Sequence, residues 1–129
     1  MTPKDFVRAL FEKWEGGDSS AFFAALADDA SWTASGHTPI SGTYASKAEY
    51  LQKTYLPLQA VFAGATICKV KRMTAEDELV VVEWHGETPL KRGGVYSNDY
   101  CWVLAVREGK IAEVTGYFDT EAVTQLFKV

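Results

Sequence analysis

The side chains with the clearest capacity for proton transfer are a histidine, an aspartate and a tyrosine. His37 lies in a Gly- and Pro-containing loop, where an imidazole could act as a general base near neutral pH, although a surface loop histidine without a role is the plainer interpretation. Asp119 follows the last predicted strand and could reach a pocket rim, but Asp before Thr-Glu-Ala also suits a helix N-cap. Tyr100 lies within a predicted strand. His37, Asp119 and Tyr100 are therefore the candidate catalytic residues.

Other kinds of chemistry find little support in the sequence. Glu83 and His85 are two residues apart and share a strand face, but two groups are too few for a closed zinc site. Cys68 and Cys101 lack CxxC spacing, which favours free thiols in a reducing compartment over a disulfide. No Gly-rich loop opens a helix after a strand in the manner of phosphate-binding sites. We predict neither a metal nor a cofactor.

Length and charge narrow the class of protein. The 129 residues suit one domain spanning 1–129. The net charge is -4, and the basic residues form isolated pairs such as Lys71-Arg72, so nucleic acid is not an expected partner. The longest apolar runs fall far short of the roughly 18 residues of a membrane span, and the N-terminus lacks a signal-peptide apolar region. We expect a cytoplasmic protein with no membrane association.

The first half of the chain is predicted to be mainly helical. Thr2-Pro3 begins an apolar stripe at helical spacing that Gly16-Gly17 ends. A second helix carrying Phe22, Phe23 and Leu26 closes near Asp28-Asp29, before a short strand over 30–34. Residues 35–43 form a loop. A third helix extends from Ser46 to Phe62, and Pro57 kinks or interrupts it.

The second half is predicted to be a run of strands. β-rich segments cover 66–73, 79–87, 95–107 and 110–118, with short turns between them that favour consecutive antiparallel pairing. A short helix capped by Asp119 ends near Phe127. Three helices followed by a meander of strands indicate the α+β class, because a parallel sheet would need crossover helices between its strands.

Alternation along the strands separates two faces of the predicted sheet. Between 95 and 107, one column holds Asn98, Tyr100 and Trp102, while the other holds smaller residues suited to close packing or a subunit contact. Such a column is more often solid core, but its amide, phenol and indole groups need polar partners and so favour a cavity. The predicted pocket wall comprises Trp14, Tyr55, Trp84, Asn98, Tyr100, Trp102, Val114, Gly116 and Phe118. Glu83 and His85 are expected on the outer face.

Five segments carry a resemblance to a known family. They are Ala27-Asp28-Asp29-Ala30-Ser31-Trp32, Pro39-Ile40-Ser41-Gly42-Thr43-Tyr44, Asn98-Asp99-Tyr100, Gly109-Lys110-Ile111 and Tyr117-Phe118-Asp119-Thr120. Together they resemble the SnoaL-like and ketosteroid-isomerase-like branch of the nuclear transport factor two-like superfamily. The resemblance implies a cone-shaped, curved antiparallel sheet packed round three N-terminal helices, a cystatin-like or nuclear-transport-factor-two-like barrel. It also implies a small-molecule pocket with Thr33 and His37 at its mouth. A homodimer formed through the outer sheet face is a further implication.

The catalytic positions of the known enzymes in this superfamily are not filled by acids here. Ketosteroid isomerase uses an Asp base with Tyr and protonated Asp donors. By resemblance, those positions fall on Thr33 or Ala34, Leu10 or Phe11, and Cys101 or Trp102. Limonene epoxide hydrolase carries an Arg-x-Asp pair on one strand, and by resemblance these two positions fall on Trp84 and Gly86. Its acidic residue two positions before the Phe of the closing Tyr-Phe-Asp falls on Gly116. The inward carboxylate of polyketide cyclases has no clear counterpart.

Three functions remain open at the level of sequence. The first is a domain that binds an apolar or cyclic small molecule. The second is a cofactor-independent isomerase, cyclase or dehydratase that uses general acid and base catalysis through His37, Asp119 or Tyr100. The third is an interaction module in which the outer sheet face mainly mediates dimerisation. The missing carboxylates favour the first.

Overall fold

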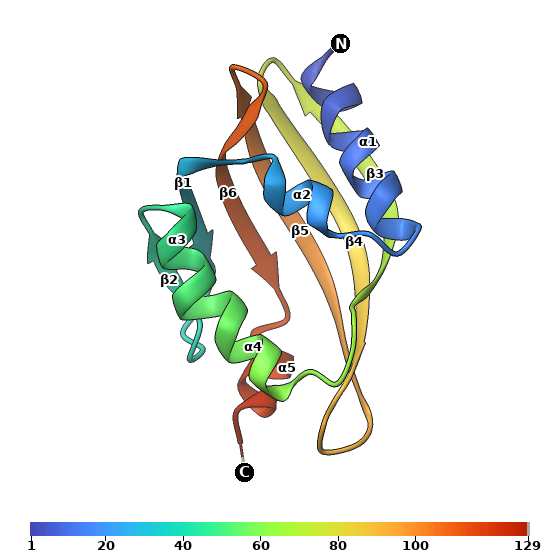
Figure 1. Ribbon diagram of the computed structural model, residues 1–129, viewed down its shortest axis with the longest axis vertical. Helices are drawn as coiled ribbons and strands as arrows, with labels where there is room; N and C mark the ends of the chain where they lie inside the picture. Colours follow the sequence, from blue (N-terminus) through green and yellow to red (C-terminus); the bar gives the residue numbers. More distant parts are fainter. Residues whose placement is uncertain (129) are drawn as a thin grey trace.

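Twelve elements make up the chain in a computed structural model that describes residues 1–128, so that Val129 of the predicted 1–129 domain lies outside the described residues (Figure 1). The helices are α1 (Pro3–Glu15), α2 (Ser20–Ala24), α3 (Lys47–Tyr50), the π-helix η1 (Leu51–Tyr55), α4 (Leu56–Val61) and α5 (Thr120–Leu126). The strands are β1 (Leu26–Ala34), β2 (Gly42–Tyr44), β3 (Ile67–Glu76), β4 (Leu79–Pro89), β5 (Val95–Arg107) and β6 (Lys110–Phe118).

Helix α1 forms as its local sequence predicts. The Thr2 hydroxyl accepts a hydrogen bond from the Asp5 N–H at 3.1 Å, and the Asp5 carboxylate accepts one from the Thr2 N–H at 3.3 Å. This capping box satisfies two N–H groups that a helix start otherwise leaves unpaired. The apolar face of the helix buries Phe11 and Trp14 against the sheet.

The second helix is shorter, and β1 starts earlier, than the sequence predicts. Helix α2 ends at Ala24, and Leu26 already lies in β1, where it pairs with Ile111 of β6. Asp28 and Asp29 fall where the register shifts between Leu26 and Ser31, so they are exposed strand residues and do not close a helix. A five-residue helix has little cooperative stability, and burial of Leu26 on the sheet decides the boundary.

The predicted interruption near Pro57 is a widened helical turn. In η1 the N–H of Leu56 donates to the carbonyl oxygen of Leu51, five residues back. Proline lacks an N–H, and its ring would collide with the carbonyl group of Lys53 in a regular α-helix. The π-turn relieves that collision, and α4 continues to Val61, one residue short of the predicted end.

The sheet has the strand order β2-β1-β6-β5-β4-β3. The predicted antiparallel pairing of β3, β4, β5 and β6 is confirmed. Two features were not predicted: β1 pairs with β6 in parallel, and β2 begins at the end of the predicted loop over 35–43 and pairs with β1. The edge strands β2 and β3 do not pair with each other, so the curved sheet stays open and does not close as a barrel.

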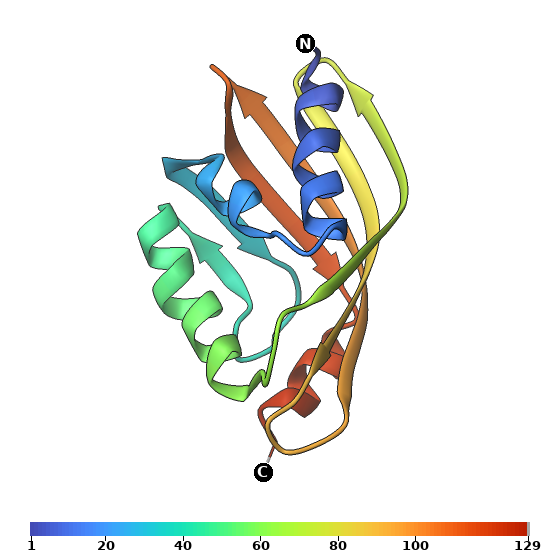
Figure 2. The ribbon, with the colours of Figure 1, turned by 45° about the vertical axis from the view of Figure 1, so that its right-hand side comes forward.

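Curvature gives the sheet a concave and a convex face. Helices α1, α2, α3 and α4 all lie against the concave face (Figure 2). A cluster of aromatic rings fills the space between α1, α2 and the sheet, with Phe11, Phe22 and Trp102 within 6.2 Å of one another by ring centroids. The predicted cone of sheet round N-terminal helices is therefore confirmed, and its wider part lies between the sheet and the helical segment 47–61.

Candidate functional site

A cavity of about 350 Å³ lies between the concave sheet face and the helices. Its wall draws on α1, α2, α3, η1 and α4 on one side and on β1, β4, β5 and β6 on the other. Helix α5, the loop before β2 and the segment 62–66 complete it. The lining residues are Trp14, Ser19, Phe23, Trp32, Ala34, Ile40, Tyr50, Thr54, Tyr55, Leu58, Gln59, Phe62, Gly64, Ala65, Thr66, Trp84, Tyr96, Tyr100, Trp102, Phe118 and Val123. Within this described wall there is no Asp, Glu, His, Lys or Arg side chain.

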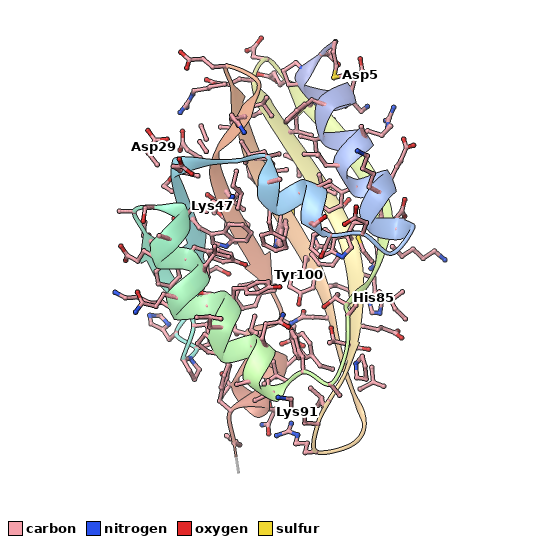
Figure 3. The ribbon with its side chains drawn as sticks, in the orientation of Figure 1. Asp5, Asp29, Lys47, His85, Lys91 and Tyr100 are labelled. Carbon is pink, nitrogen blue, oxygen red and sulfur yellow. The ribbon has the colours of Figure 1, made fainter. Side chains whose placement is uncertain are left out.

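Strand register brings the sheet-side aromatic residues together. Trp84 on β4 is opposite Tyr100 on β5, and Tyr100 is opposite Phe118 on β6. The rings of Trp84 and Tyr100 stack, with centroids 4.3 Å apart and planes inclined by 17°. Figure 3 shows Tyr100 at the centre of the molecule, between the sheet and the helical segment 47–61. The result is one continuous aromatic wall.

Six of the residues predicted for the pocket border this cavity. They are Trp14, Tyr55, Trp84, Tyr100, Trp102 and Phe118. Val114 and Gly116 do not. Val114 is buried in the packed core, and Gly116 lies behind the indole of Trp102, since a Cβ atom there would be 3.1 Å from Trp102 Nε1. The glycine therefore makes room for a wall residue without being one.

Thr33 is also placed differently from the prediction. Its hydroxyl group is 3.1 Å from that of Thr43 on the neighbouring strand, and it faces away from the cavity. The inward positions of β1 belong to Trp32 and Ala34, because alternate strand residues face opposite sides.

Asn98 supports the wall from behind and does not line it. It is 4% exposed, and its Oδ1 accepts a hydrogen bond from the Asp119 N–H at 3.0 Å. Its Nδ2 donates to the Asp119 carbonyl oxygen at 3.0 Å and to the Tyr96 hydroxyl at 2.7 Å. The amide thus joins the end of β6 to a phenol of the cavity wall.

Tyr96 and Tyr100 form a pair of hydrogen-bonded phenols in the wall. Their hydroxyl oxygens are 2.8 Å apart. Burial raises the pKa of both hydroxyl groups, that of Tyr100 well above its ordinary value. Both phenols are therefore neutral at physiological pH and act as hydrogen-bond donors, not as bases.

Several wall residues are missing from the sequence prediction. Tyr96 lies two positions before Asn98 in the same strand column, so extending the alternation would have found it. Tyr50 stacks on Trp32 with centroids 3.8 Å apart, and burial raises the pKa of its hydroxyl group. Thr54 lies on the π-turn. No local signal reveals Tyr50 and Thr54, because the direction of their side chains depends on how the helical segment packs.

Two buried polar atoms in the wall residues have no hydrogen-bond partner among residues 1–128. They are the Oγ1 of Thr54 and the Nε1 of Trp84, on residues that are 3% and 2% exposed. Burying such a group without a partner destabilises a fold, and each case calls for an explanation. A ligand that forms hydrogen bonds with these two atoms is one such explanation.

The other two candidate catalytic residues lie outside the cavity wall. His37 is exposed and borders a separate shallow depression beside α5, so the expectation that it stands at the pocket mouth is not met. Asp119 caps α5: its carboxylate accepts from the N–H groups of Glu121 and Ala122 at 3.0 and 3.4 Å. Of the three, Tyr100 alone belongs to the wall.

The convex face carries the charged residues of the sheet. His85 Nδ1 is 2.9 Å from Asp99 Oδ1, and its Nε2 is 3.0 Å from Glu87 Oε2. The hydrogen bonds to Asp99 and then to Glu87 raise the pKa of His85. Lys71 also contacts Asp99, at 2.6 Å, and Glu83 pairs with Arg72. As predicted, Glu83 and His85 are on the outer side; Figure 3 shows His85 on the part of the sheet formed by β3 and β4.

An open sheet curved round helices and a central cavity define a nuclear-transport-factor-two-like fold, and solved structures agree. A protein of that class from Burkholderia thailandensis matches 100% of this chain and 99% of its own length, with 23% identity and a TM-score of 0.80. TerC, co-crystallised with polyporic acid, covers 97% and 98%, with 20% identity and a TM-score of 0.76. IdmH, a putative polyketide cyclase from Streptomyces antibioticus, covers 100% of both chains, with 18% identity and a TM-score of 0.72.

The family is identified from the sequence itself. The model of the SnoaL-like domain family matches residues 7–114, and the chain belongs to that family. The predicted resemblance is thereby confirmed. Comparison with curated proteins gives no match. In residues 1–128, no helix combines the length and apolar character needed to cross a membrane.

Proposed function

We propose that this SnoaL-like domain binds an uncharged, cyclic small molecule in its aromatic cavity. The observation that carries the proposal is the wall itself: about 350 Å³ bounded largely by aromatic rings, without a charged side chain among the described lining residues. That volume lies within the range of small-molecule sites. A charged ligand would lose its hydration there without gaining an ionic partner, whereas flat apolar rings gain both burial and stacking.

A solved relative supports the binding of a cyclic small molecule by this fold, while the choice of an uncharged ligand rests on the cavity wall alone. TerC, which shares the fold, was co-crystallised with polyporic acid. The two unpartnered atoms of Thr54 and Trp84 also suit an occupied cavity, because a polar group of the ligand or an ordered water would satisfy them. We include a cytoplasmic location in the proposal, since both cysteines are free thiols.

Tryptophan fluorescence tests the proposal directly. All four tryptophans of the chain, Trp14, Trp32, Trp84 and Trp102, line the cavity. Titration with flat uncharged ring compounds should change the emission saturably, and carboxylated analogues of the same size should bind at least ten times more weakly. Equal affinity for the charged and uncharged members of such pairs contradicts the proposal.

A matched pair of variants locates the binding. Ala34 is 6% exposed and lines the cavity, so Ala34→Phe fills part of it and should abolish the titration. Ala75 is exposed on β3 and outside the wall, so Ala75→Phe should leave it unchanged. Loss of binding in both variants, or in neither, excludes the cavity as the site.

A cofactor-independent isomerase, cyclase or dehydratase is the second candidate, and the phenol pair is the observation that favours it. Tyr100 can donate to an oxygen that develops negative charge, but its raised pKa makes it a poor base. With no carboxylate or imidazole in the described wall, binding is the stronger proposal. If turnover of a cyclic substrate is found, His37→Gln should leave the rate unchanged, and a lost rate would return His37 to the mechanism.

Association of two copies through the convex sheet face is a further part of the proposal. Within residues 1–128 no helix covers that face (Figure 2). Tyr117 is 52% exposed there, opposite Cys101 in the strand register. Glu83 and Asp99 are already paired with basic residues, which lowers the cost of burying them. Light scattering should report a dimer at micromolar concentration and a monomer for Tyr117→Glu, with Ala75→Glu as control; a monomeric parent protein contradicts the dimer.

A further inference from the structure

The direction of one hydrogen bond in the cavity wall is determined by the main chain behind it. Asn98 Oδ1 accepts from the Asp119 N–H, and Asn98 Nδ2 donates to the Asp119 carbonyl oxygen. Exchanging the oxygen and nitrogen of the amide would set donor against donor and acceptor against acceptor at Asp119. The nitrogen therefore faces Tyr96, and the Tyr96 oxygen accepts from Asn98 at 2.7 Å.

The two phenols have one proton available for donation to a ligand. Each hydroxyl group carries one proton, so Tyr96 and Tyr100 hold two between them. The single contact between their oxygens, at 2.8 Å, uses one of these protons. Asn98 occupies a lone pair of Tyr96 and uses neither proton. One phenolic proton is left without an acceptor among the described residues, and both tyrosines border the cavity.

We propose that this free O–H selects ligands that bear an uncharged acceptor oxygen, such as a ring ketone, with Asn98 as the positioning residue that donates to Tyr96 and so takes up neither phenolic proton. The inference rests on the proposed binding function. A ketone oxygen accepts the proton at the wall, while its ring system lies on the aromatic rings around it. A hydrocarbon of the same shape leaves the buried proton unpaired, which weakens its binding.

The chain of hydrogen bonds also strengthens the phenolic O–H donor that faces the cavity. When Asn98 donates to Tyr96 and Tyr96 donates to Tyr100, each hydrogen bond polarises the next. The acceptor oxygen of the ligand is then the end of a chain of four donors, namely the Asp119 N–H, Asn98, Tyr96 and Tyr100. Tyr96 and Tyr100 both belong to β5, so a rigid central strand holds them.

A pair of probes that differ only at the carbonyl group tests the proposal. Fluorenone and fluorene have the same flat ring system, and tryptophan fluorescence gives the dissociation constant of each. We compare the preference for the ketone in the parent protein and in the double variant Tyr96→Phe/Tyr100→Phe, so that the different solubility of the probes cancels. The preference should be about tenfold larger in the parent protein.

The two single variants, each with one phenol replaced, provide a further test. Tyr96→Phe and Tyr100→Phe each keep one phenolic proton with no other acceptor, so each should retain most of the preference. An equal preference in the parent and double variant overturns the inference while leaving the binding function intact. Failure of both probes to bind the parent protein overturns the proposed function and this inference with it.

An infrared measurement keeps the inference testable if the double variant does not fold. The carbonyl stretch of fluorenone bound to the parent protein should lie below its frequency in a dry alkane, as a hydrogen-bonded carbonyl requires. A band at the alkane frequency overturns the inference. Thermal unfolding followed by circular dichroism distinguishes a misfolded variant from a folded one that has lost the preference.

Discussion

The indole ring of Trp84 lies flat against the phenol ring of Tyr100, 4.3 Å away, because the two residues are directly opposite each other on antiparallel strands. This one pairing makes the sheet side of the cavity smooth and aromatic. It also holds the Tyr100 hydroxyl within reach of Tyr96. Shape and polarity of the site thus have a common origin in the register of β4 with β5.

Replacement of Thr54 tests whether its buried hydroxyl group serves a ligand. Thr54→Val keeps the side-chain shape and removes an oxygen that has no partner in residues 1–128. The free energy of unfolding should rise by about 1 kcal/mol, as measured by urea denaturation, since an unsatisfied buried polar group is lost. Lower stability would mean that the hydroxyl group is already satisfied in the unliganded protein.

Gly116 should tolerate no side chain. A Cβ atom there would be 3.1 Å from Nε1 and 3.2 Å from Cδ1 of Trp102, so Gly116→Ala displaces a wall residue. We expect a loss of about 1–3 kcal/mol in unfolding free energy and a shifted tryptophan emission. Gly16→Ala is the control, because nothing lies closer than 3.4 Å to its added Cβ. An unchanged emission in Gly116→Ala contradicts the packing described for Trp102.

Asp119 should matter for stability and not for ligand binding. Asp119→Ala removes the side-chain cap of α5 and should cost about 1 kcal/mol in unfolding free energy. Asp119→Asn should restore most of that stability, because asparagine caps helices equally well. Titration with a cavity ligand should give the same affinity in all three proteins. A selective loss of binding or turnover in Asp119→Asn would instead indicate a chemical role for the carboxylate.

His85 should make stability depend on pH. Both ring nitrogens contact carboxylates, and a neutral imidazole can donate to only one, so the full set of bonds requires the protonated ring. Its pKa is raised from 6.5 by hydrogen bonds to Asp99 and Glu87. The stabilisation is therefore present below about pH 6.5 and is lost as pH rises through the raised pKa of the folded protein.

The pKa of His85 can be measured by NMR, because the chain has only two histidines and their ring signals are easily distinguished. Proton NMR of the ring C–H groups should show His85 titrating at higher pH in the folded than in the unfolded chain. His85→Gln should remove that part of the pH dependence of unfolding, and His37→Gln should not. The effect is small, because the carboxylates of Asp99 and Glu87 are largely exposed.

The sequence predicts the fold well where local signals decide it. The start of α1 at Thr2-Pro3 and the alternating strands of the second half are readable from nearest neighbours, and both form as expected. The boundaries of α2 and β1 cannot be predicted from neighbouring residues, because Leu26 joins the sheet by pairing with the distant Ile111. Strand β2 is only three residues long and exists because β1 offers it a free edge.

The candidate site is predictable on the sheet and much less so on the helices. Period-two alternation indicates Trp84, Tyr100 and Trp102 as residues of one face. The assignment of Thr33 depends on a resemblance, while alternation alone places it opposite to Trp32. Thr54 is not predicted because it lies on the π-turn, where the widened turn shifts the helical spacing, and no local pattern signals that shift.

Parallel pairing of β1 with β6 has a consequence for biosynthesis. A strand made early, over 26–34, finds one of its two neighbours only when residues 110–118 have been made. Contacts so distant in sequence slow folding, and the ribosome delivers β6 after the other five strands of the sheet. Until then the growing chain carries a row of unpaired main-chain groups next to exposed indole rings, so the nascent protein is most prone to aggregation before residues 110–118 emerge.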